Sequence, residues 1–272
     1  MKKFLLIFIT ILCCFAAIGQ SKKSSNFLAH FKTVVSGKWL LVTYLETLKK
    51  TSSPLKAQTK GFDLTQLFVN IDDANNKSIN ADGWSLHEGG LGITIYFTPG
   101  VTRNSFKTDF HNPQKSNIAF TDIGYTIKGK DSFLVLYHFN EAKKLLQITK
   151  FKKSSTPSII SSDKFLDYVV NKTLFTGNYS GKDNEGNNVN ISFTNEGGIY
   201  GLQEFTKYKV STFILQRSKG NYYNKIYFLD NDNAPVLYAF TFVGKKLFLY
   251  ELTENKNEQM VLGSLKYNLI KK

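Results

Sequence analysis

The chain has almost no cysteine. Its only two, Cys13 and Cys14, lie within the first twenty residues, so the body can hold neither a disulfide framework nor a cysteine-based zinc site. Long hydrophobic runs are equally scarce: there is one, at the N-terminus, which excludes a multi-span membrane protein. The four histidines are widely separated and form no His-x-His or His-x-x-x-His pair: His30, His87, His111 and His138. We therefore expect no metal site. His138 shares a strand face with leucines, and we expect it to be a buried or rim histidine whose hydrogen bonds are made.

Arginine is also rare, although the chain is basic. Lys and Arg total 35 against 21 Asp and Glu, a formal net charge of +14, but the only arginines are Arg103 and Arg217. Nucleic-acid-binding surfaces usually cluster arginine, whereas lysines scattered near strand ends mainly protect sheet edges. We therefore expect no nucleic-acid partner. A general attraction to acidic polysaccharides or membrane surfaces stays open.

Residues 1–19 have the pattern of a signal peptide. Two lysines precede an apolar stretch, Phe4 to Phe15, and Ala17 and Gly19 fit the small-x-small cleavage rule. Cleavage after Gly19 removes the two lysines and lowers the formal net charge to +12. We expect a secreted or periplasmic protein that meets the membrane only through the cleaved signal.

Two alternatives to cleavage are disfavoured by the same residues. A lipoprotein would acylate Cys13 or Cys14, but a lipobox needs a small residue before the cysteine, and Leu12 precedes Cys13. A retained anchor is disfavoured because the apolar run is shorter than the roughly 20 residues that span a bilayer.

The rest of the chain is rich in apolar and aromatic residues, at 42% and 14%, enough for a large core. Residues 27–35 predict a short amphipathic helix with Asn26 as N-cap. Alternating patterns then follow, as in Ile93 to Thr98 and Val189 to Thr194. Asn, Asp and Gly clusters separate these runs, which predicts many short antiparallel strands in an all-β barrel or sandwich.

The strand pattern occurs twice in the same order. A short helix followed by Gly37-Lys38-Trp39 matches a helix followed by Gly177-Asn178-Tyr179, and Gly-Lys turns recur before late apolar strands in both halves. Each half ends on two lysines, and Ser154 to Ser158 has the composition of a linker. We predict two tandem barrel domains, 26–153 and 162–272, with the alternative of two unrelated β-meanders that share turn residues.

A helical turn followed by Gly-x-Trp at the first strand resembles the lipocalin-like (calycin) families. The signature residues are Gly37 and Trp39, with Gly177 and Tyr179 in the second half. The resemblance implies that the Trp packs across the barrel base, and that each domain is an eight-stranded antiparallel barrel preceded by a short helix, with room for one small ligand. Two further matches are less close. Thr121-Asp122 is similar to a second motif of the family. Arg217 would correspond to the basic residue that covers the Trp, but Arg217 belongs to the other half.

Motifs for catalysis are missing. There is no Gly-x-Ser-x-Gly elbow, and the mature chain has no cysteine nucleophile. Glycoside hydrolysis needs two paired carboxylates, but spacing selects no pair among the available candidates, Asp63, Asp82, Glu88, Glu196 and Glu204. The acidic segments at 183–188 and 230–233 fit hairpin turns better than calcium loops. We expect no enzyme activity, no catalytic residue and no cofactor.

Tyrosines on the expected strands give the remaining functional hint: Tyr44, Tyr96, Tyr125, Tyr137, Tyr200, Tyr223, Tyr227 and Tyr238. Facing inward, they would line an amphipathic pocket, and facing outward, they would bind sugars or proteins. Ordinary barrel packing is the third possibility. We expect a binding protein for a small apolar or amphipathic ligand, with an envelope or extracellular interaction module as the alternative. The sequence identifies neither the ligand-binding residues nor the oligomeric state.

Overall fold

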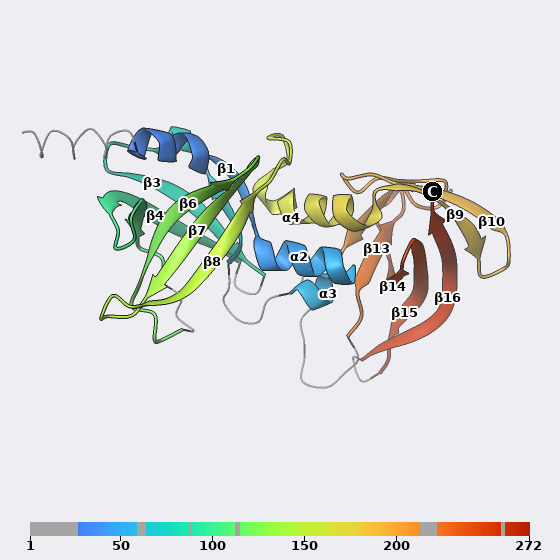
Figure 1. The fold of residues 1–272 in the computed structure, drawn as a ribbon. Helices are drawn as coiled ribbons and strands as arrows, with labels where there is room; N and C mark the ends of the chain where they lie inside the picture. Colours follow the sequence, from blue (N-terminus) through green and yellow to red (C-terminus); the bar gives the residue numbers. More distant parts are fainter. Residues whose placement is uncertain (1–26, 59–63, 87–88, 112–114, 213–221, 257–258) are drawn as a thin grey trace, which may run out of the picture. The chain divides into compact units, whose positions relative to one another are not determined.

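The protein is all-β: of the residues that the structure describes, 52% are in strands and 18% are in helices, and the strands form two eight-stranded antiparallel sheets (Figure 1). The computed structural model describes residues 27–58, 64–86, 89–111, 115–212, 222–256 and 259–272. The expected signal peptide and Asn26 lie outside these residues. The predicted fold class, two antiparallel barrels that each follow a helix, is confirmed.

The first sheet is a closed barrel whose strands pair in chain order. Two short helices and one 3₁₀ turn interrupt the early strands. The elements are β1 (Gly37–Leu41), α2 (Val42–Thr51), α3 (Pro54–Ala57), β2 (Leu64–Val69), η1 (Ile71–Asp73), β3 (Ser78–Ser85), β4 (Gly89–Pro99), β5 (Ser105–Thr108), β6 (Phe120–Lys128), β7 (Asp131–Phe139) and β8 (Leu145–Lys153).

The second sheet has the strand order β11-β10-β9-β16-β15-β14-β13-β12. Its elements are α4 (Ser162–Val170), η2 (Asn171–Phe175), β9 (Gly177–Asp183), β10 (Asn188–Phe193), β11 (Ile199–Tyr200), β12 (Lys207–Val210), β13 (Lys225–Leu229), β14 (Pro235–Val243), β15 (Lys246–Glu254) and β16 (Met260–Lys271).

Backbone hydrogen bonds join the two ends of the second sheet. Gly198 forms an antiparallel bridge with Lys207, and the Tyr208 N–H donates to the Gly197 carbonyl over 2.7 Å. Gly197 has φ +90°, and a Cβ there would lie 2.8 Å from the Tyr208 carbonyl oxygen. Only glycine tolerates this conformation and approach without strain, so this residue allows the sheet to curl back on itself.

A helix precedes each sheet, as predicted. Residues 27–35 are helical, with Phe31 and Val35 fully buried. In the second half, α4 continues into a single π-turn, η2, which buries Phe175. None of the helices in the described residues is long and apolar enough to cross a membrane.

The late strands of the two halves match in length and turn geometry. β6 and β14 each have nine residues, as do β7 and β15. The hairpin turns contain Gly129 at φ +60° and Gly244 at φ +59°, the left-handed conformation that a two-residue hairpin turn requires. The predicted tandem architecture is confirmed at the level of two barrel-like sheets.

The chain divides into two compact units that are not continuous in sequence. Unit 1 contains residues up to 39, 67–83 and 90–154, and unit 2 contains residues 40–66, 84–89 and 155–272. α2 and α3 therefore belong to the unit that contains the second sheet, although they lie between β1 and β2. The domain boundaries expected from the sequence, 26–153 and 162–272, follow chain order and stay a prediction.

The expectation that Tyr44 lies on a strand is wrong, because Tyr44 lies on the helix α2. Tyr44 and Leu48 are four residues apart, share a helix face and are both fully buried. Lys49 and Lys50 occupy the last turn, where positive charge suits the helix dipole. Tyr223 is likewise outside any strand, shortly before β13.

Aromatic side chains fill the described interior of the second sheet. Phe193 lies at the centre, with ring centroids 5.0 to 6.0 Å from those of its neighbours. Those neighbours are Phe175, Tyr179, Tyr208 and Phe228, all at most 3% exposed. Packing is therefore the role of most inward aromatics here, which is the third possibility raised by the sequence.

Candidate functional site

Trp39 is fully buried in the first unit, at the start of β1. Its indole Nε1 donates a 2.7 Å hydrogen bond to the Val35 carbonyl, at the end of the preceding helix. The Lys153 ammonium lies 5.3 Å from the Trp39 ring and donates to the Val34 carbonyl over 2.8 Å. Gly37, at φ +125°, lies against the Lys153 stem, so that a Cβ there would be 3.1 Å from Lys153 Cε.

The second half repeats this arrangement. Tyr179 is 1% exposed, and its hydroxyl donates to the Leu174 carbonyl over 3.3 Å. The Lys271 ammonium lies 5.8 Å from the Tyr179 ring. Gly177 has φ +135°, and a Cβ there would be 2.9 Å from Lys271 Cε. Desolvation by burial raises the pKa of Tyr179, so the phenol stays neutral.

Lysines from the last strands therefore cover both signature aromatics. Lys153 lies over the Trp39 ring, where the family resemblance implies a basic residue. Arg217, the less close match for that residue in the sequence, lies outside the described residues. The clue in the sequence was the pair of lysines that ends each half. All four signature residues pack against the last strand of their own half, and the two aromatic ones also bond to the preceding helix: Gly37, Trp39, Gly177 and Tyr179.

His138 is a buried, hydrogen-bonded histidine on β7, as predicted, at 4% exposure. Its Nδ1 lies 3.0 Å from the Thr121 hydroxyl and its Nε2 lies 2.9 Å from the Thr149 hydroxyl. Gln147 donates to the same Thr149 hydroxyl. This chain of polar groups joins β6, β7 and β8 and accounts for both ring nitrogens, which is the arrangement of a structural histidine.

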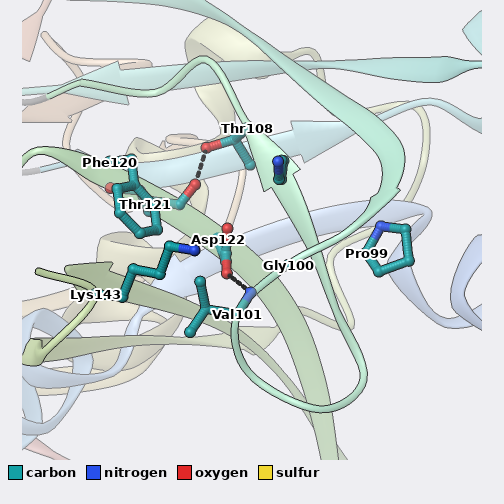
Figure 2. Close-up of a pocket in the computed structure, with 9 residues that line it drawn as sticks. Pro99, Gly100, Val101, Thr108, Phe120, Thr121, Asp122 and Lys143 are labelled. Atoms are coloured by element: carbon teal, nitrogen blue, oxygen red, sulfur yellow. Dashed lines mark hydrogen bonds between the residues drawn. The ribbon is translucent and has the colours of Figure 1, made fainter. Parts of the chain in front are cut away.

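A pocket of about 520 Å³ lies against β5 and β6 of the first barrel. Alternation places it on the outer wall: Phe106 and Ile123 are buried and paired, so their neighbours Lys107 and Asp122, which are also paired, face the other way. Figure 2 shows the β4–β5 loop curving over this face. The residues that line the pocket are Pro99, Gly100, Val101, Lys107, Thr108, Phe120, Thr121, Asp122 and Lys143.

Asp122 anchors the loop that forms one wall. One carboxylate oxygen accepts the Val101 N–H over 2.5 Å, as Figure 2 shows, and lies 3.5 Å from the Ser105 hydroxyl. A Cβ at Gly100 would collide with this carboxylate, so the loop can approach so closely only because residue 100 is glycine. The side chain is 1% exposed, and its other oxygen has no hydrogen-bond partner.

Burial is the main influence on the Asp122 carboxyl, and it raises the pKa above its ordinary value. The N–H groups of Val101 and Thr102, the Ser105 hydroxyl and the Lys107 charge each lower the pKa and partly oppose this effect. The result is a carboxyl group that ionises less readily than a surface aspartate.

Two lysines and an apolar surface complete the pocket. Lys107 extends from β5 and Lys143 from the turn between β7 and β8, where it has φ +59°. Both are exposed, and in Figure 2 the Lys143 ammonium points toward Asp122 and Val101. Phe120 gives the apolar wall and is held by stacking on Phe139, with ring centroids 5.1 Å apart.

Other candidates from the sequence do not form a site. Asp63 and Glu88 lie outside the described residues, Asp82 is on β3 of unit 1, and Glu196 and Glu204 are in unit 2. Among the residues that the structure describes, no three His, Cys, Asp or Glu side chains gather to hold a metal ion.

The two acidic segments are hairpin turns, as expected. Asp230 accepts the N–H groups of Asp232 and Ala234 between β13 and β14. Asp183 accepts those of Glu185 and Asn187 between β9 and β10. The carboxylates are therefore used to stabilise turns.

The sequence does not predict this pocket on the outer wall of the first barrel, which we call the wall pocket. Asp122 is singled out there only through a family motif, and Lys107 and Lys143 belong to none of the motifs described above. The available signal was Pro99-Gly100, a turn dipeptide at the end of a long alternating run, but the turn does not reveal that an aspartate on another strand holds it.

Comparison of the chain with known protein families and with curated proteins found no match.

Proposed function

We propose that this chain is an exported, non-enzymatic, lipocalin-like binding protein whose small ligand occupies the wall pocket of the first barrel. The observation that carries the proposal is the composition of this pocket. It combines about 520 Å³ of space, within the range of small-molecule sites, with an apolar wall and a few convergent polar groups. The calycin relationship and export remain part of the proposal, on the residues given above.

The barrel interiors favour the wall over the lumen as the site. Buried aromatic rings occupy the interior of the second sheet. In the first half, Phe31 of the preceding helix packs against Phe106 of β5 and Tyr125 of β6, and the ring centroids of Phe31 and Phe106 are 4.8 Å apart. An eight-stranded barrel either fills with side chains or holds one ligand, and side chains of this size favour filling. This moves the proposed site outward from the lumen position that the family resemblance implies.

The proposal is tested by native mass spectrometry of protein purified from its source, followed by measurements on variants. We expect a bound small molecule, and we expect Val101→Trp to abolish its binding because the larger side chain fills the pocket. Val243→Trp is the matched control, since Val243 is also exposed but lies at the end of β14. Ligand binding that Val101→Trp leaves unchanged would place the site elsewhere.

A second candidate function is an interaction module with filled barrels. The observation in its favour is a group of exposed apolar residues on β8: Leu145, Leu146 and Ile148 are 42%, 39% and 46% exposed. Apolar groups of this kind on a surface often mark contacts with other proteins. Finding no small molecule on the native protein, together with loss of a protein partner in Ile148→Lys, would favour this function.

A further inference from the structure

We propose that the wall pocket selects amphipathic anions, with the acidic head group at Lys107 and Lys143 and the apolar body against Phe120, Val101 and Pro99. This inference rests on the proposed function and specifies the class of ligand. The shared chemistry is a carboxylate or phosphate attached to an apolar group.

The first argument is the charge of the pocket. Two ammonium groups and one carboxyl group line it, so its net charge is positive even when Asp122 is ionised. Burial raises the pKa of Asp122, which makes the positive excess larger. Because both lysines are exposed and come from different segments, both ammonium groups can donate hydrogen bonds to the same acidic head group.

The second argument is the depth at which each charge lies. Asp122 is 1% exposed beneath the loop, whereas Lys107 and Lys143 are on the surface. A ligand approaching from solvent therefore meets positive charge first. A cationic ligand would have to pass both lysines to reach a carboxylate that already accepts a hydrogen bond from Val101.

The third argument is the shape of the apolar side. Pro99 is the last residue of β4, Val101 lies in the loop that follows, and Phe120 is the first residue of β6. Val101 is 45% exposed. These side chains offer contact to a flat or aliphatic body beside the two ammonium groups. A purely inorganic anion would leave this apolar surface without a partner.

The experiment compares compounds that share a body and differ in charge. Isothermal titration calorimetry on the full mature chain would use 2-naphthoate, 2-naphthyl phosphate, 2-naphthalenemethanol and 2-naphthylmethylamine. We expect both anions to bind more tightly than the neutral alcohol, and the amine to bind least. The tighter of the two anions identifies the head group.

Variants locate the effect. Lys143→Gln and Lys107→Gln should each weaken the tighter anion about three- to ten-fold, the loss expected for one partly exposed ionic hydrogen bond. Lys144→Gln and Lys150→Gln remove exposed lysines that do not line the pocket and should leave affinity unchanged. Asp122→Asn keeps an acceptor for the Val101 N–H but removes the negative charge, and should tighten anion binding.

Several outcomes would overturn the inference. They are equal binding of all four compounds, tightest binding of the amine, no binding of either anion at millimolar concentration, or equal losses in the pocket and control lysine variants. If the native ligand is neutral and is still displaced by Val101→Trp, the proposed function stands and the anion selectivity fails. If Val101→Trp has no effect on any ligand, the proposed site itself is wrong.

Discussion

Trp39 and Tyr179 perform the same task with different chemistry. Each aromatic ring lies at the start of the first strand of its sheet, donates a hydrogen bond to a carbonyl at the end of the preceding helix, and carries a lysine from the last strand on its face. A buried polar tip needs such a partner. The lysines also link the last strand to the first, next to backbone bonds from Ser154 to Lys38 and from Lys272 to Asn178.

Trp39→Ala should lower the free energy of unfolding by about 3–5 kcal/mol, the usual range for a large buried aromatic. Trp39→Phe should lower it less, because the ring remains and only the bond to Val35 and part of the volume are lost. Urea denaturation measures both. Tyr200→Ala is the control, since Tyr200 is 64% exposed, and it should change stability by less than about 0.5 kcal/mol. If Trp39→Ala left the free energy of unfolding nearly unchanged, the expectation that Trp39 packs across the base of the first barrel would be wrong.

At the scale of elements, hydrogen bonds connect the start of α3 with Asn224, a residue far away in the sequence. Ser53 is the N-cap of α3: its hydroxyl oxygen accepts the Lys56 N–H over 3.1 Å and its hydroxyl donates to Asn224 Oδ1 over 2.7 Å. The Leu55 N–H donates to the same Asn224 oxygen over 3.1 Å. Pro54 at the first helical position needs no N–H partner. Ser53 is 3% exposed, so these bonds are sheltered from water.

Ser53→Ala should lower the free energy of unfolding by about 1–2 kcal/mol, because it removes a cap and leaves Asn224 with one donor fewer. Asn224→Ala should have a similar effect. The double variant should cost less than the sum of the two, since both single changes break the same bond. Chemical denaturation of the four proteins measures this coupling. Strict additivity would mean that Ser53 and Asn224 act independently.

At the scale of the whole molecule, sequence order and compact units differ. Residues 40–66 come from the first half, but they belong to unit 2 with residues 155–272. Within unit 2, Tyr44 and Leu48 of α2 are fully buried, and the Asn224 contact ties α3 to the loop before β13. The segment 155–272 alone would therefore expose apolar surface that α2 and α3 cover.

Limited proteolysis with subtilisin should first cut between Ser154 and Ser162, where Ile159 is 89% exposed. The two fragments should then elute together under native conditions and separate only in denaturant, because part of the first fragment completes unit 2. Size-exclusion chromatography followed by gel electrophoresis detects this. Separation of the fragments without denaturant would mean that residues 40–66 contribute little to unit 2.

The sequence alone determined the fold class and its duplication. Period-2 patterns and Asx-rich turns are local, so they report strands and hairpins wherever packing agrees with them, as at 93–97 in β4 and at Asp230. The duplication could be recognised from Gly-x-Trp and Gly-x-Tyr, because both places in the structure need a glycine with positive φ followed by a buried aromatic ring. The helix at Tyr44 was missed because a mixed run of Val, Thr and Tyr favours a strand until tertiary contacts select the face shared with Leu48.

Only the tertiary structure decided where the candidate site lies. Lys107, Asp122 and Lys143 belong to β5, β6 and the turn after β7, and barrel closure places them at one pocket. Alternation shows that Asp122 faces outward, but not that the loop at 100–104 covers it and buries its carboxyl. Likewise, the lysine pairs at the ends of β8 and β16 do not indicate in the sequence that one lysine of each pair covers Trp39 or Tyr179. These relations depend on strand register and on contacts between residues far apart in sequence, which local patterns do not encode.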